Sequence, residues 1–201
     1  MGSNFELIAA MALFAFVTSI TPGPNNMMLL ASGVNFGLRR SIPHLLGISG
    51  GHFIMLILVG AGLDALLALH PAIYQVMKVL GFAYLLYLVW GIAKSAAPQS
   101  SDTGRPQPLS FIGAAAFQWV NPKAWIMALG YFSNFMPADA SMVFIVVTCL
   151  MFSLVNFPCI VVWVVLGEKL ERYLKSDRSR KTFNWVMALL LFVSMIPAFL
   201  I

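Results

Sequence analysis

Long apolar runs, separated by short polar gaps, constrain this chain more than any other feature. A helix that crosses a membrane needs about 20 mainly apolar residues, because the hydrocarbon core is roughly 30 Å thick. Apolar segments of about this length lie at roughly 5–32, 42–64, 72–93, 110–136, 141–166 and 183–201. Only 9% of the residues are charged, whereas soluble proteins have about 25%. We therefore expect an all-α integral membrane protein of about six transmembrane helices, with a single transmembrane domain over residues 1–201.

A gap rich in Ser, Pro and Gln divides these segments into two groups of three. This linker covers residues 97–108, between a first half at 1–96 and a second half at 109–201. Because each half has an odd number of crossings, the second half must enter the membrane from the opposite side. We therefore expect two inverted three-helix halves, an architecture found in secondary transporters.

The basic residues lie on one side of this arrangement. The gaps after the first, third and fifth segments hold ten of the 12 Lys and Arg residues: Arg39, Arg40, Lys94, Arg105, Lys169, Arg172, Lys175, Arg178, Arg180 and Lys181. The other two gaps hold Asp64, His70 and Asp139. Cytoplasmic loops carry an excess of Lys and Arg, so we expect a cytoplasmic linker and both termini outside the bacterial inner (plasma) membrane. The net charge of +5 therefore does not indicate a nucleic-acid partner.

Proline interrupts the first and fourth apolar segments. The interruptions are Thr21-Pro22-Gly23-Pro24-Asn25 and Asn121-Pro122-Lys123. Proline cannot donate a helical hydrogen bond, so the carbonyls of Thr18, Ile20 and Gln118 lose their usual donors. Broken backbone is tolerated within a membrane only where it is buried in protein or lines a watery cavity. We predict that these residues bind a zwitterion, with freed carbonyls facing its ammonium and helix-start amides facing its carboxylate. The alternative is a pair of packing kinks.

Further motifs follow in the sequence, and together with the two interruptions they cover about the first two-thirds of the chain. They are Gly37 with a following basic pair, Gly47 and Gly51, and Lys78-x-x-Gly81-x-x-Tyr84-Leu85. In this order the motifs resemble the LysE/RhtB family of amino-acid exporters. The doubled Asn25-Asn26 looks more similar to the cysteine and O-acetylserine branch than to the homoserine/threonine branch.

The resemblance implies secondary active export of a small amino acid or derivative, driven by the proton gradient. We accordingly expect a transporter, not an enzyme, with no cofactor. Its partners would be the amino acid, protons and the lipid bilayer. The sequence leaves open which amino acid is moved, which ion is coupled, and whether the chain forms a homo-oligomer.

Ionisable residues within a membrane are costly and are therefore candidates for function. Lys123 lies about 13 residues, or roughly 20 Å, beyond Ser110, too far for easy snorkelling. We expect it to bind a substrate carboxylate or to take part in proton coupling. Lys78 and His52 are further candidates for proton coupling. The alternatives are outward snorkelling for Lys78 and a neutral, hydrogen-bonded imidazole for His52.

The sequence allows three other interpretations. Gly47-Ile48-Ser49-Gly50 has the GxSG form of an intramembrane serine protease, but that chemistry needs a histidine from another helix, and the last three segments contain none. Close helix packing explains these glycines better.

Cys149 and Cys159 are too far apart on one helix for a thiol-redox pair, and no Cys/His cluster indicates a metal. A passive amino-acid channel is the third interpretation, and the sequence does not exclude it. Asn156 and Pro158 are expected to line a cavity.

Overall fold

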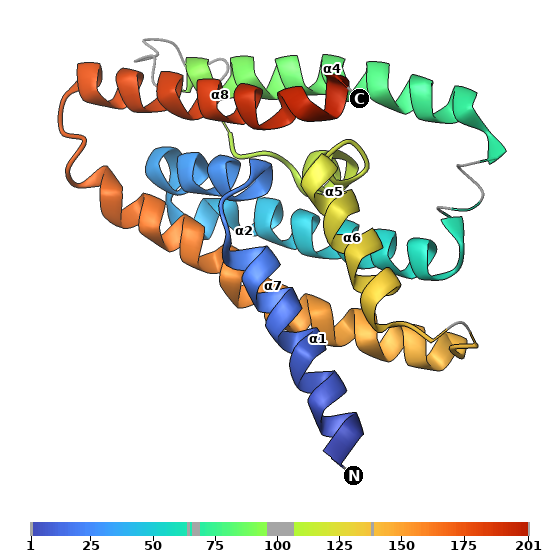
Figure 1. Ribbon diagram of the computed structural model, residues 1–201. Helices are drawn as coiled ribbons and strands as arrows, with labels where there is room; N and C mark the ends of the chain where they lie inside the picture. The colour runs from blue at the N-terminus through green and yellow to red at the C-terminus, as the bar shows by residue number, and fades with distance from the viewer. Residues whose placement is uncertain (1, 64, 66–68, 96–106, 138, 201) are drawn as a thin grey trace.

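The computed structural model describes residues 2–63, 65, 69–95, 107–137 and 139–200, and its regular elements are all α-helices (Figure 1). The helices are α1 (Gly2–Ile20), α2 (Pro24–Gly60), α4 (Pro71–Lys94), α5 (Phe111–Gln118), α6 (Pro122–Phe135), α7 (Met142–Glu171) and α8 (Asp177–Leu200). Among the described residues, three stretches are long and apolar enough to cross a membrane: Pro24–Gly60, Gln75–Lys94 and Met142–Glu171. The prediction of an all-α membrane protein is confirmed.

Both predicted interruptions are present. α1 ends at Ile20 and α2 begins at Pro24, while α5 ends at Gln118 and α6 begins at Pro122. Each proline occupies the first turn of its helix, where a missing N–H costs little because that group would have no helical partner. The two prolines therefore start new helices.

α2 consists of two arms, 24–36 and 38–60, which fold back on each other at Gly37 (Figure 1). Gly37 has φ 74° and ψ 172°, a backbone conformation that favours glycine. The arms pack together, since Leu29 of the first and Ile48 of the second belong to one buried cluster. The polar gap expected at 33–41 is therefore only a tight turn, because helical backbone continues into it from both sides.

α8 also differs from the expected boundary. It begins at Asp177 instead of near residue 183, so that three basic residues lie in its first turns. A helix is not limited to its apolar stretch, because its backbone hydrogen bonds form equally well beyond the lipid. Arg180 pairs with Glu171 at 2.8 Å and so connects α8 to the end of α7. Asp64, Arg105 and most of the linker at 97–108 lie outside the described residues.

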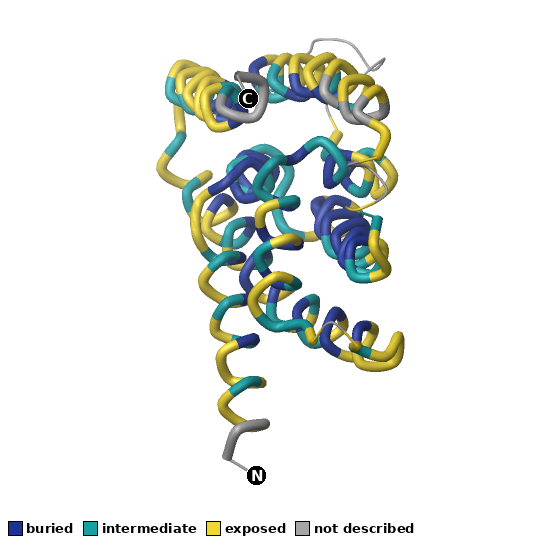
Figure 2. The backbone as a smooth tube through the Cα atoms, turned by 45° about the vertical axis from the view of Figure 1, so that its right-hand side comes forward, coloured by how far each residue is buried: buried dark blue, intermediate teal, exposed yellow. Residues whose placement is uncertain are grey.

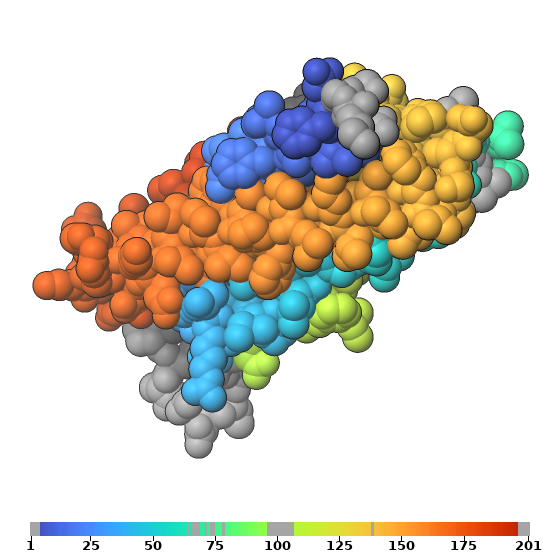
Figure 3. All heavy atoms as spheres, turned by 90° about the horizontal axis from the view of Figure 1, so that it is seen from below, coloured from blue at the N-terminus to red at the C-terminus, as the bar shows by residue number. Residues whose placement is uncertain are grey.

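α2 and α7 form the centre of the molecule. Their contact is close, because a Cβ on Gly33 or on Gly167 would meet the backbone of the other helix. Figure 3 shows α7 along one face, with α1 on one flank and α2 on the other. α4 and α8 lie side by side in a separate layer, at the top of Figure 1.

The buried core lies where α1, α2, α6 and α7 meet, around Met11, Met55, Tyr131 and Phe152. Figure 2 shows which stretches of the backbone are exposed, and many of their residues are large and apolar, such as Val143 at 73% exposure. Such surfaces are unusual on a soluble monomer, and they suit a chain whose solvent is lipid.

Candidate functional site

A small polar cavity lies between the two interruptions. Its walls come from α1, α2, α6 and α7 and from the residues that join them, and they include Ser19, Gly23, Asn25, Asn26, His52, Asn121, Lys123 and Asn156. The cavity volume is about 20 Å³, which is room for about one water molecule. The site is closed in this conformation and must widen before an amino acid can occupy it.

The ammonium group of Lys123 is held by the residues between α1 and α2. Nζ donates hydrogen bonds to the carbonyl oxygens of Thr21 at 2.6 Å and Pro22 at 3.2 Å, and to Oγ1 of Thr21 at 3.0 Å. These residues follow the end of α1 at Ile20, so they lie outside its regular hydrogen bonding.

The sequence predicted that the carbonyls of Thr18, Ile20 and Gln118 would face an ammonium group, and this choice of carbonyls was wrong. The Thr18 carbonyl accepts a hydrogen bond from Oγ1 of Thr21, and the Ile20 carbonyl accepts one from Trp163. The carbonyls that do face an ammonium group come directly after α1, and Lys123 supplies that group.

Gly23 leaves room for the Lys123 side chain. Its backbone is extended, with φ −177° and ψ 177°, so the position does not need glycine for its backbone angles. A Cβ at this position, however, would meet Cδ of Lys123. The glycine is therefore explained by close approach.

Asn25 and Gln118 join the two interruptions through a reciprocal pair of amide hydrogen bonds. Nδ2 of Asn25 donates to Oε1 of Gln118 at 2.8 Å, and Nε2 of Gln118 donates to Oδ1 of Asn25 at 3.2 Å. Gln118 is fully buried and also donates to the carbonyl oxygen of Ala114. The pair connects α2 in the first half of the chain to α5 in the second.

Side chains from α2 and α7 satisfy the last carbonyls of α1. Nδ2 of Asn26 donates to the carbonyl oxygens of Ser19 and Thr21, at 2.9 and 2.7 Å. Nε1 of Trp163 donates to the carbonyl oxygen of Ile20 at 3.2 Å. The end of α1 is thus held by neighbouring helices.

Asn156 and Asn121 are both buried in the cavity wall. The prediction that Asn156 lines a cavity is confirmed, and its Nδ2 donates to Oγ of Ser19 at 2.9 Å. Pro158, for which the same prediction was made, is not among the residues that line this cavity. Oδ1 of Asn121 accepts a hydrogen bond from the backbone N–H of Lys123 at 3.1 Å and so caps α6. Asn121 therefore fixes the start of the helix that carries the lysine.

Two polar atoms in the wall lack hydrogen-bond partners among the described residues. They are Nε2 of His52 and Oδ1 of Asn156. Buried polar atoms without partners are rare, so these two make the cavity a candidate binding site. Lys78 belongs to α4, and its side chain lies outside the described residues.

The sequence analysis missed several of these residues. It did not single out Ser19 or Trp163, and it noted only the main-chain carbonyl of Gln118. Ser19 and Gln118 are buried polar side chains within apolar segments, which is the signal that could have identified them.

Gly47, the first residue of the GxSG sequence, and Gly51, four residues later, lie in the contact between α2 and α5. A Cβ on Gly47 would meet the carbonyl oxygen of Phe111, and one on Gly51 would meet the backbone of Ala115. The predicted role of these glycines in close helix packing is confirmed.

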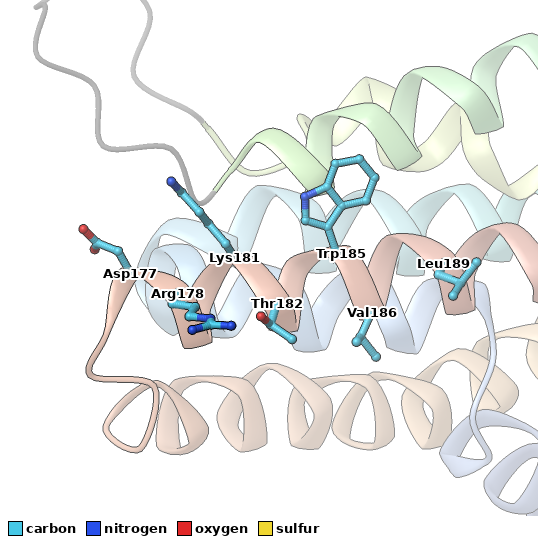
Figure 4. A pocket seen from close by; sticks show the side chains of 7 residues that line it. All are labelled: Asp177, Arg178, Lys181, Thr182, Trp185, Val186 and Leu189. Carbon is cyan, nitrogen blue, oxygen red and sulfur yellow. The ribbon is translucent and has the colours of Figure 1, made fainter.

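A groove on α8 is wider than the cavity between the two interruptions, but all its lining residues come from one helix. Its residues, Asp177, Arg178, Lys181, Thr182, Trp185, Val186 and Leu189, all come from this single helix (Figure 4). Basic residues beside an exposed tryptophan are typical of the boundary between membrane and water. The groove is therefore an outer surface, and the candidate site is the cavity between the interrupted helices.

The helices and the closed polar site define a multi-pass membrane transporter. The chain belongs to the LysE type translocator family, whose sequence pattern matches residues 16–196. This confirms the resemblance drawn from the motifs. Members of this family are translocators and not enzymes.

Curated relatives carry a more specific name. The chain is similar to proteins named cysteine/O-acetylserine efflux protein from Klebsiella pneumoniae (32% identity), Escherichia coli (30%) and Salmonella choleraesuis (29%). Each alignment covers 92% of this chain and 93% of the relative. No solved structure gives a significant match.

Proposed function

We propose that this protein exports small amino acids or their derivatives from the cytoplasm across the bacterial inner membrane. Its family and the names of its relatives support amino-acid efflux, with cysteine and O-acetylserine as the first substrates to test. Homoserine and threonine are the next substrates to test. The substrate site lies between the two interruptions, and it includes Thr21, Pro22, Gly23, Pro24, Asn25, Asn121, Pro122 and Lys123.

The contact of Lys123 with Thr21 and Pro22 carries this proposal. Three oxygen atoms already surround an ammonium group there, so the same atoms can accept the ammonium of an amino acid. The displaced Lys123 ammonium is then free to pair with the substrate carboxylate. A zwitterion satisfies both groups, whereas a simple cation or anion satisfies only one.

This exchange also provides a way to open the site. Lys123 belongs to the second half of the chain, and Thr21 to the first, so their contact holds the two halves together. A bound amino acid replaces that contact with contacts to itself. Binding then favours the opening of the closed cavity, because a ligand shifts a conformational equilibrium toward the state that it binds better.

We infer six membrane crossings in two inverted halves. The crossings are α1 with the 24–36 arm of α2, the 38–60 arm, α4, α5 with α6, α7, and α8. This division puts the linker at 97–108 in the cytoplasm and both termini outside. The positions of the basic residues support it, because ten of the 12 lie at the junctions between the first and second, the third and fourth, and the fifth and sixth crossings.

Proton-driven export is the proposed mode of transport. His52 and Lys123 line the same cavity and are the candidates for carrying the proton, with Lys78 as a third candidate. A passive channel is the alternative. The cavity of about 20 Å³ favours a carrier that opens to one side at a time, because an open pore would need a continuous passage.

The test is to measure which amino acids accumulate outside cells that overproduce the protein, with and without an uncoupler. Accumulation of cysteine and O-acetylserine that the uncoupler abolishes would support proton-driven export. Accumulation that the uncoupler does not change would indicate passive release. Cells that accumulate no amino acid at equal protein abundance would contradict the proposal.

A further inference from the structure

A second and much larger cavity lies between α2, α4 and the beginning of α5. Its volume is about 610 Å³, within the range of about 300–1,000 Å³ that is usual for small-molecule sites. Polar side chains contribute to its wall from several elements: Ser32, Asn35, His44, Tyr84, Lys94 and Ser110. We call it the α2–α4 cavity.

The charge of this cavity favours an anionic group. Lys94 is exposed at the end of α4, and its Nζ lies 4.4 Å from the centre of the Trp90 ring. Among the described residues that line the cavity, none is Asp or Glu. The ammonium group therefore has no acidic neighbour in this wall.

His44 adds an unsatisfied polar group to the wall. Its side chain is only 2% exposed, and both ring nitrogens lack hydrogen-bond partners among the described residues. The neighbouring polar groups bond to each other instead, with Oγ of Ser32 and Oγ of Ser41 2.7 Å apart. A buried imidazole without partners is costly, so a ligand that reaches His44 gains a hydrogen bond that the protein itself leaves unmade.

The α2–α4 cavity adjoins the closed site. Met28 lines the larger cavity, and Asn25, one turn earlier in α2, lines the closed site. On the second arm, His44 lines the larger cavity, and Ile48, one turn later, lines the closed site. The two cavities therefore share both arms of α2 as walls, and one helical turn, about 5.4 Å, separates them along each arm.

We propose that the α2–α4 cavity is a loading site, which binds the carboxylate of an amino acid before it passes to the closed site. Lys94 attracts the carboxylate by charge, and His44 donates a ring N–H to it. The proposal rests on the export function, since it assigns a first binding step to the same path.

Gly91 gives a direct way to test binding in this cavity. It lines the cavity and is exposed, and a Cβ there would meet no atom within 4 Å. A Gly91→Cys variant therefore adds a thiol to the wall without a clash. The native Cys149 and Cys159 are 0% and 4% exposed, so they should contribute little background.

The experiment measures how fast a membrane-impermeant thiol reagent labels Gly91→Cys in inverted membrane vesicles. O-acetylserine serves as the ligand, because cysteine would consume the reagent. It should slow the labelling several-fold. The control variant Ser176→Cys, on the exposed turn between α7 and α8, should be labelled at a rate that O-acetylserine does not change. Inorganic phosphate forms a second arm, and equal protection by phosphate would indicate a general anion site and overturn the proposal.

The Lys94→Gln and His44→Gln substitutions, each combined with Gly91→Cys, identify the groups that bind the carboxylate. Each should raise the O-acetylserine concentration that gives half protection by roughly tenfold, as expected when a hydrogen bond to a charged group is lost. Lys94→Arg should largely restore protection. Export without any protection of Gly91→Cys, or protection unchanged in Lys94→Gln, would overturn the loading site. Protection without export would contradict the export function instead.

Discussion

The carbonyl oxygen of Thr21 accepts a 2.6 Å hydrogen bond from Nζ of Lys123, 102 residues later in the chain. This contact joins the interrupted helix of the first half to that of the second. It lies at a cavity with two unpartnered polar atoms, and its oxygens are the ones that we propose accept the ammonium group of a substrate in place of Lys123.

Gly23→Ala should impair export strongly, because its Cβ would meet the Lys123 side chain and displace the ammonium from its oxygens. We expect at least a tenfold lower export rate at normal protein abundance, measured as amino acid released per unit of transporter. Gly50→Ala is the matched control, since its Cβ would make only ordinary van der Waals contact with the Phe111 ring, at 3.5 Å, and Gly50 lines neither cavity. Normal export by Gly23→Ala would argue against a functional role for the Lys123 contact.

Asn25 and Gln118 should behave as a coupled pair. Asn25→Ala leaves the buried Gln118 amide partly unsatisfied, at a cost of about 1–3 kcal/mol, and Gln118→Ala does the same for Asn25. The double variant should lower the free energy of unfolding by less than the sum of the two single variants, because all three lose the same interaction. The measurement is the thermal unfolding of the purified protein in detergent. Additive effects would show that the two amides are energetically independent.

Gly33 and Gly167 should be essential for packing. A Cβ on either residue would meet the backbone of the other helix, which cannot move aside like a flexible side chain. We expect Gly33→Ala and Gly167→Ala to destabilise the protein by about 1–3 kcal/mol and to lower its abundance in the membrane. Unchanged abundance and melting temperature in both variants would mean that α2 and α7 can separate at little cost.

The inferred topology predicts where reporters function. A reporter that is active only in the cytoplasm should stay inactive when fused after Ile201, and should be active when inserted into the linker at 97–108. The reason is that six crossings bring the end of the chain back to the outer side. An active reporter at the C-terminus would contradict the inverted halves.

The sequence predicted the larger features of the fold because apolar length and proline chemistry are local properties. The apolar segments and the interruptions at Pro24 and Pro122 follow from residue type alone. The turn at Gly37 is different, because its left-handed backbone depends on how the arms of α2 pack. The start of α8 was missed because hydropathy marks the apolar stretch, whereas the helix continues through basic residues.

The candidate site was only partly predictable. The residues of the two interruptions could be identified from Pro, Gly and Asn in apolar surroundings. Their partners could not, because the Asn25 pair with Gln118 and the Lys123 contact with Thr21 connect residues about a hundred positions apart. The α2–α4 cavity also depends on tertiary packing, and no local pattern indicates it.

Uptake of labelled cysteine, O-acetylserine, threonine and homoserine into inverted vesicles, under an imposed proton gradient, tests the central claim most directly. The wild-type protein should take up at least one of them, and Lys123→Met should insert normally but move none, because it cannot pair with the substrate carboxylate. Lys123→Arg should retain binding better than transport, since it keeps the charge but not the compact, titratable ammonium. Wild-type rates in Lys123→Met would contradict the account and show that the lysine is structural.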